Sequence, residues 1–130
     1  VDAGVIDMVE FCEMVSRDEM SDYYQKSDLL VSSSISETFG LSVCEALACG
    51  KPVVTTASGG VSDIVTPANG ITVPVGDDES LAKAIIKIKT GAQSFEPQSL
   101  RNSVLERFGT QLFIKKLSSL YHDVLTEREG

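Results

Sequence analysis

Short apolar, β-branched runs recur about every twenty residues in the first part of this chain and alternate with helical patterns. The apolar side chains within each run are nearly continuous, which is typical of parallel strands covered on both faces. The sequence therefore predicts an α/β fold, a Rossmann-like parallel sheet with helices on both faces. The runs expected to form its strands are Met8–Cys12, Leu29–Ser32, Val53–Thr56 and Ile71–Val73.

Helix start and stop signals fill the segments between the runs. Ser16 and Glu19 have the spacing of a capping box, Gly50 follows an apolar helical segment, and Asp77 stands where a helix cap belongs. We expect helices over 16–26, 41–49, 61–65, 80–89 and 98–125, the last with a break near Gly109.

The length suits one domain, because 130 residues can bury one core but not comfortably two. A doubly wound nucleotide-binding domain usually has five or six strands, whereas only four are visible here. We therefore expect residues 1–130 to be a single, partial domain, with 98–125 as its C-terminal helical segment.

Composition excludes several classes of function. The net charge of −8 disfavours nucleic-acid binding, which requires a basic surface. The chain has one histidine, His122, and its three cysteines (Cys12, Cys44 and Cys49) form no CxxC pair, so we expect no metal site and reduced thiols in the cytoplasm. No apolar run is long enough for a membrane span.

The chemistry is concentrated after the second apolar run. A loop carrying Glu37 and Gly40 leads into a helix that begins near Leu41. Ligands of α/β proteins bind at the carboxyl ends of parallel strands, and a helix N-terminus presents unpaired N–H groups that suit a phosphate. This segment is the candidate anion site.

Glu45 is a carboxylate on an almost entirely apolar helix. We expect that helix to be buried, so Glu45 needs a basic partner or a ligand that donates hydrogen bonds. It lies four residues after Leu41, about 6 Å along the axis at about 1.5 Å per residue, an offset that suits a ribose whose phosphate lies at the helix start. A partly exposed surface glutamate or an internal salt bridge is the alternative interpretation.

The segment ETFGLSVCEALACGKPVV, which begins at Glu37, resembles the E-x7-E segment of retaining GT-B glycosyltransferases of the GT4 type, also described as glycosyl transferases group 1. The form usual in that family is EGFGLxxxEAMAxGxPVV. Residues 20–30, 59–65 and 69–77 are similar to further segments of the family, and the resemblance extends over 8–121 without large gaps.

The resemblance implies transfer of a sugar from a nucleoside-diphosphate sugar to an acceptor, with retention at the anomeric carbon and no essential metal or other cofactor. It also implies a role for each matching position. These are Glu37 as the catalytic-site residue at the donor sugar, Phe39, Gly40 and Leu41 at the diphosphate, Glu45 at the ribose, and Met14, Val15 and Ser16 at the base.

The chain departs from the family pattern at Glu13, Ser33 and Thr38, which stand in place of glycine, proline and glycine. The basic pair that holds the donor phosphates in the family lies upstream of the matched segments, as does the acceptor domain. We therefore expect a partial nucleotide-sugar-binding domain that binds donor weakly and is inactive alone. Its full-length form is expected in surface polysaccharide or glycolipid synthesis, in the cytoplasm or peripheral to the membrane.

Two other functions stay open on the residues alone: a nucleotide-sugar epimerase of the same architecture, and a non-catalytic nucleotide-binding α/β module.

The last helical segment adds an expectation about partners. Its broad apolar face predicts an exposed patch and possible self-association through this helix.

Overall fold

The computed structural model describes residues 4–127 and shows an α/β fold, as the sequence predicts. Residues 1–3 and 128–130 lie outside the described part. In chain order the elements are η1 (Ile6–Met8), α1 (Arg17–Lys26), β1 (Leu30–Ser32), α2 (Leu41–Ala48), β2 (Val53–Thr56), α3 (Val61–Ile64), β3 (Gly70–Val73), α4 (Asp78–Lys89), α5 (Pro97–Phe108) and α6 (Thr110–Glu127).

The three strands form a parallel sheet in the order β1-β2-β3. Successive side chains of a strand point to opposite faces, and the central strand shows the result. Val53 packs in one hydrophobic cluster with α2, α3 and α5, whereas Val54 packs in a second with α4. The prediction of helices on both faces is confirmed.

The larger of the two clusters holds most of the core. Leu47, Ile64 and Leu100, from α2, α3 and α5, are among its fully buried side chains. Tyr24 is the buried residue of α1 and joins the same cluster. Burial of each large apolar side chain stabilises a fold by about 1.5–3 kcal/mol, so α5 is an integral part of this core.

The predicted helix ends are largely confirmed. The Glu19 carboxylate accepts hydrogen bonds from the backbone and hydroxyl of Ser16, and Asp77 caps α4 by accepting from the backbone N–H of Ser80 at 2.9 Å. The predicted break at Gly109 is confirmed: its backbone is extended (φ −66°, ψ 149°), and a Cβ there would lie 2.4 Å from the carbonyl oxygen of Leu105, which favours glycine.

The prediction of a strand over Met8–Cys12 is wrong. Ile6–Met8 is a single 3-10 turn, and the residues that follow form no strand. Met8 and Phe11 are largely exposed, and no other strand of the described residues lies beside this segment to supply hydrogen bonds. The sheet of residues 4–127 therefore has three strands, not four.

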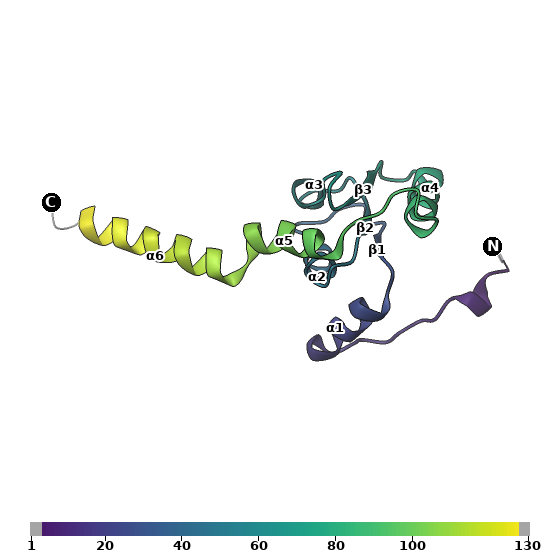
Figure 1. Cartoon of the computed structure of the whole chain (residues 1–130), viewed down its shortest axis with the longest axis horizontal. Helices are drawn as coiled ribbons and strands as arrows, with labels where there is room; N and C mark the ends of the chain where they lie inside the picture. The colour runs from purple at the N-terminus through teal and green to yellow at the C-terminus, as the bar shows by residue number, and fades with distance from the viewer. Residues whose placement is uncertain (1–3, 128–130) are drawn as a thin grey trace.

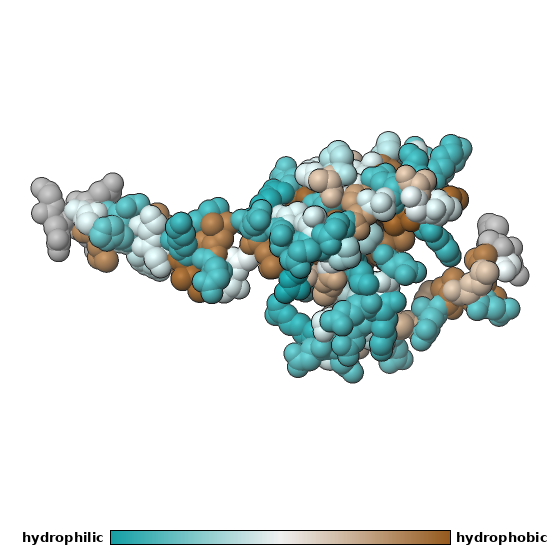
Figure 2. All heavy atoms as spheres, in the orientation of Figure 1, coloured by the Kyte–Doolittle hydropathy of each residue, from teal (hydrophilic) through white to brown (hydrophobic). Residues whose placement is uncertain are grey.

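The last helix lies outside the compact part of the chain. Figure 1 shows α6 extending away from the sheet, with the C-terminus at its far end. Its apolar side chains remain largely exposed, as Figure 2 shows, so the expectation of an exposed apolar face is confirmed. No helix within residues 4–127 is long and apolar enough to cross a bilayer.

Candidate functional site

The predicted anion site begins at a glycine that no other residue could replace without strain. Gly40 is buried, has φ +90° and is the N-cap of α2. A Cβ at this position would lie 2.8 Å from Cγ2 of Val61 in α3. The left-handed backbone turns the chain from the loop into α2, and the absent side chain lets α2 and α3 approach closely.

The start of α2 presents backbone N–H groups without protein acceptors. No acceptor within residues 4–127 is assigned to the N–H groups of Phe39, Gly40 or Leu41. The first N–H groups of a helix have no intrahelical partner and carry partial positive charge. The three positions predicted for a diphosphate therefore form one contiguous group of potential donors.

The loop that carries Glu37 is packed against the start of α3. The backbone N–H of Gly60 donates to the carbonyl oxygen of Glu37 at 3.1 Å. A Cβ on Gly59 or Gly60 would lie 2.0 Å from the Glu37 carbonyl oxygen or 2.4 Å from that of Thr38. The half-buried Glu37 carboxylate accepts a hydrogen bond from the backbone N–H of Thr38 at 3.1 Å. This loop is thus held in place by its neighbours.

Further hydrogen bonds tie together the carboxyl ends of the three strands. Thr56 Oγ1 donates to the carbonyl oxygen of Ser34 at 2.6 Å, which joins β2 to the loop after β1. The backbone N–H of Ala57 donates to the carbonyl oxygen of Val73 at 2.8 Å, which joins β2 to β3. The edge of the sheet where ligands bind in this fold class is therefore well supported.

The Glu45 carboxylate accepts a hydrogen bond from a neutral side chain of the protein, not from a basic residue. The Tyr24 hydroxyl donates to Glu45 Oε2 at 3.0 Å, and Glu45 is half-buried. The expectation that Glu45 is buried is therefore wrong, because α2 leaves this side partly open against α1, whereas a ligand that donates hydrogen bonds to the carboxylate stays a prediction. Burial and the hydrogen bond to Glu45 raise the pKa of Tyr24. Tyr24 thus remains a protonated donor at neutral pH.

A small cavity of about 220 Å³ lies between α1 and α2 beside this pair. Arg17, Tyr24 and Glu45 are among its lining residues, so a guanidinium group and the Glu45 carboxylate line the same cavity. The residues predicted at the base lie just before α1. Met14 is 100% exposed, Val15 is half-buried, and neither lines this cavity.

Ser16 is the N-cap residue of α1 and is bonded to Glu19, so its hydroxyl has a structural role. Glu37, Phe39, Gly40, Leu41 and Glu45 are thus brought together on one loop and helix. The structure does not bring Met14, Val15 and Ser16 into the same cavity.

The fold places two cations that sequence reasoning missed beside the start of α2. A cavity of about 370 Å³ is lined by Phe39 and Leu41 on one side and by Arg107 and Lys116 on the other. The rings of Phe39 and Phe108 meet edge to face, with centroids 5.4 Å apart. The cations lie some seventy residues away in sequence, and no local pattern signals that they belong to this region.

Arg107 is already engaged in local contacts. It donates to the carbonyl oxygen of Asp63 at 2.7 Å, and its guanidinium carbon lies 5.0 Å from the centroid of the Phe108 ring. These contacts fasten the end of α5 to α3, so Arg107 is a structural clamp beside the candidate site.

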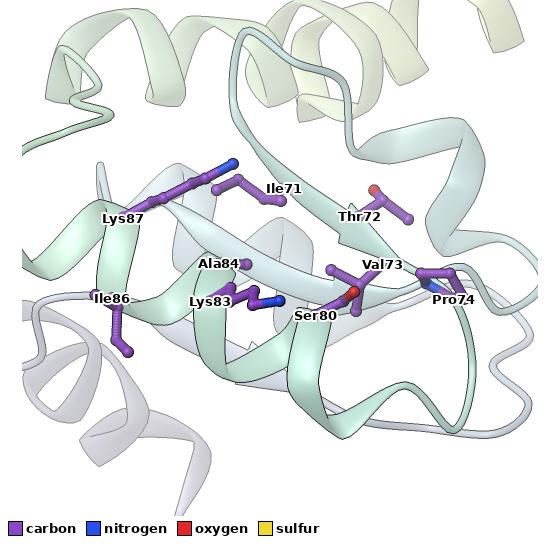
Figure 3. A pocket seen from close by; sticks show the side chains of 9 residues that line it. All are labelled: Ile71, Thr72, Val73, Pro74, Ser80, Lys83, Ala84, Ile86 and Lys87. Atoms are coloured by element: carbon purple, nitrogen blue, oxygen red, sulfur yellow. The ribbon is translucent and has the colours of Figure 1, made fainter.

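A larger cavity, of about 500 Å³, lies away from every predicted residue. It is formed between β3 and α4, where Lys83 and Lys87 extend along the strand and Ile86 points away from it (Figure 3). Lys83 is paired with Glu79 at 2.6 Å on the exposed face of the helix. Cavity size therefore does not identify the candidate site, whereas the backbone geometry at the start of α2 does.

Comparison with known proteins decides the family. The model of the family described as glycosyl transferases group 1 matches residues 2–103. The chain belongs to this family.

Several group 1 transferases and related structures are similar to the chain over most of its length. A D-inositol 3-phosphate glycosyltransferase of Paenarthrobacter aurescens is 35% identical over 112 residues, which cover 85% of this chain and 28% of that protein. An N-acetyl-alpha-D-glucosaminyl L-malate synthase of Bacillus anthracis is 29% identical over 114 residues, covering 85% of this chain and 30% of that protein.

Solved structures give the same result. Sucrose-phosphate synthase of Thermosynechococcus elongatus superimposes with a TM-score of 0.85 at 30% identity, covering 95% of this chain and 32% of that one. Anabaena HepE in complex with UDP superimposes with a TM-score of 0.63 at 29% identity, covering 79% of this chain and 30% of that one. The chain thus spans about a third of the length of the proteins it matches. The α/β fold of this chain is therefore the kind found in GT-B glycosyltransferases.

Proposed function

We propose that this group 1 chain is the donor-binding part of a retaining glycosyltransferase, which transfers a sugar from a nucleoside-diphosphate sugar to an acceptor. The observation that carries the proposal is the start of α2, where Phe39, Gly40 and Leu41 offer free N–H groups at the carboxyl edge of the sheet. The Glu45 carboxylate lies one turn further along the same helix.

The geometry suits the departure of a nucleoside diphosphate. As the bond to the anomeric carbon breaks, negative charge grows on the diphosphate, and fixed N–H dipoles at the helix start stabilise that charge without reorganisation. Gly40 allows the phosphate to approach the backbone closely. Glu37, on the loop held by Gly59 and Gly60, is proposed as the catalytic residue that contacts the sugar.

Glu45 is proposed as the ribose-binding residue. A carboxylate has about four acceptor positions, and the Tyr24 hydroxyl occupies one of them at Oε2. The other positions can accept hydrogen bonds from both ribose hydroxyls. Because Tyr24 is buried and fixed by the core, the carboxylate is oriented before a ligand arrives.

The remaining proposals concern the ligand class, the residues at the nucleotide base and the setting of the full-length protein. HepE of Anabaena has been solved with UDP and with UDP-glucose, which supports a nucleotide-sugar ligand here. Met14, Val15 and Ser16 are proposed at the base, with no metal or other cofactor required. Membership in a transferase family favours transfer over epimerisation or a non-catalytic role. For the full-length protein, we propose a cytoplasmic or membrane-peripheral location and a role in polysaccharide or glycolipid synthesis.

Titration calorimetry of the chain with UDP, GDP and ADP tests the proposal. We expect one nucleotide to bind, weakly, and Glu45→Gln to lower its affinity at least tenfold, because an amide offers fewer and weaker acceptors to the ribose. Glu106→Gln, on the exposed face of α5, is the matched control and should bind like wild type. Equal affinity in folded Glu45→Gln and wild-type chains would contradict the ribose role.

A further inference from the structure

Two aromatic side chains meet beside the start of α2 without belonging to either hydrophobic cluster. The rings of Phe39 and Phe108 are nearly perpendicular, at 88°, with their centroids 5.4 Å apart. Phe39 is 44% exposed and Phe108 is 40% exposed, and neither side chain is part of the two clusters that form the core. Burial in the core therefore does not explain this pair. Its distinctive effect is to join the loop after β1 to the end of α5.

The ring of Phe108 is supported by α5 and by α3. Leu100, Val104 and Phe108 follow one another at intervals of four residues, so they lie on one face of α5, and the first two are buried in the core. The guanidinium carbon of Arg107 lies 5.0 Å from the centroid of the Phe108 ring, and the same side chain donates to the carbonyl oxygen of Asp63 in α3. Phe108 is thus a fixed support for the side chain that it contacts.

The supported residue, Phe39, lies between two of the N–H groups proposed for the diphosphate. Its own N–H belongs to the peptide plane before its Cα, and the N–H of Gly40 belongs to the plane after it. Glu37 and Gly40 are both held by α3, through a backbone hydrogen bond and a close approach respectively. Between them, the ring contact with Phe108 adds a hold from α5. A fixed Phe39 therefore fixes the directions of both N–H groups.

We propose that Phe108 is a positioning residue for donor binding, which acts through the Phe39 ring and holds the N–H groups of Phe39 and Gly40 toward the diphosphate. The ligand in this proposal rests on the proposed function, whereas the ring contact is a property of the free chain. Binding groups work when the residues behind them hold them to within about 0.5 Å. The end of α5 thereby serves the site without a residue that touches the ligand.

NMR relaxation of the free chain tests the support without a ligand. The Phe39 and Gly40 amides should have order parameters typical of rigid backbone, about 0.85, and Phe108→Leu should lower both toward about 0.6. Phe108→Tyr keeps the ring and should keep the wild-type values. Leu105→Ala is the matched control, because Leu105 is 42% exposed on the same helix and does not line the cavity shared by Phe39 and Phe108. Unchanged order parameters in Phe108→Leu would overturn the proposal.

Nucleotide affinity tests the consequence for binding, with circular dichroism to verify that each variant is folded. Phe39→Leu and Phe108→Leu should each weaken binding of the nucleotide that calorimetry selects by about threefold to tenfold, the value of an aromatic pair. The double variant should bind no more weakly than either single one, because both lose the same contact. Phe108→Tyr should bind like wild type.

Additive losses in the double variant, or wild-type affinity in Phe108→Leu, would overturn the proposal. A wild-type chain that binds no nucleoside diphosphate would instead contradict the proposed function, and the order parameters of the free chain decide separately whether Phe108 holds the loop.

Discussion

Gly60→Ala tests whether the loop after β1 is held in place by the start of α3. Gly60 has φ −62° and ψ −18°, which any residue can adopt, so alanine introduces no backbone strain there. The added Cβ would lie 2.4 Å from the carbonyl oxygen of Thr38 and 3.0 Å from the Cα of Phe39, well inside ordinary contact. The Thr38–Phe39 backbone must therefore retreat by roughly 1 Å, twice the ~0.5 Å tolerance of a binding site.

The expected effects follow from that overlap. Overpacking of a well-packed region costs about 1–3 kcal/mol, so urea denaturation should show a loss of stability in this range. Nucleotide affinity should fall as well, by about tenfold for each 1.4 kcal/mol of binding free energy lost. Ser62→Ala, at an exposed position of the same helix, is the control and should change stability by no more than about 0.5 kcal/mol. A Gly60→Ala chain as stable as Ser62→Ala would refute the argument.

Two further predictions concern stability. Leu100→Ala should cost about 2–5 kcal/mol in urea denaturation because Leu100 is fully buried, whereas Leu105→Ala, at a residue 42% exposed on the same helix, should cost about 0.5 kcal/mol; similar losses in both would contradict the placement of α5 in the core. The raised pKa of Tyr24 means that the folded chain keeps a proton that the unfolded chain releases near pH 10, so stability should fall as the pH rises above about 10. Tyr24→Phe should make this alkaline fall shallower, and an unchanged dependence of the urea midpoint on pH would argue against a pKa of Tyr24 raised by burial and by the hydrogen bond to Glu45.

Local signals in the sequence predict the elements whose ends are set by neighbouring residues. Ser16 with Glu19, Asp77 and Gly109 fix helix ends through contacts within four residues, and these helices lie close to where the sequence places them. The three observed strands are likewise short runs, each containing valine or isoleucine, that the sequence places within one residue of their observed ends.

The segment Met8–Cys12 shows where such signals fail. Its residues have the composition of a strand, but a strand requires a neighbour in a sheet, and none lies beside it among the described residues. Strand formation depends on pairing across the fold, which residue preferences alone do not supply.

Glu45 and the cations show the same limit at the site. The sequence places Glu45 on an apolar helix but does not reveal that Tyr24, twenty-one residues earlier, supplies its hydrogen bond. It also gives no sign that Arg107 and Lys116 line a cavity with Phe39 and Leu41. These are tertiary contacts between segments far apart in the sequence, so local sequence patterns do not predict them.

The central claim is that a nucleoside diphosphate binds at the start of α2, and amide chemical-shift mapping by NMR tests it most directly. Titration of the labelled chain with the nucleotide that calorimetry selects should shift the amide signals of Phe39, Gly40 and Leu41 first, with Glu45 beside them. Shifts confined to the cavity between β3 and α4, around Thr72 and Lys87, would contradict the claim and place the ligand on the opposite face of the sheet.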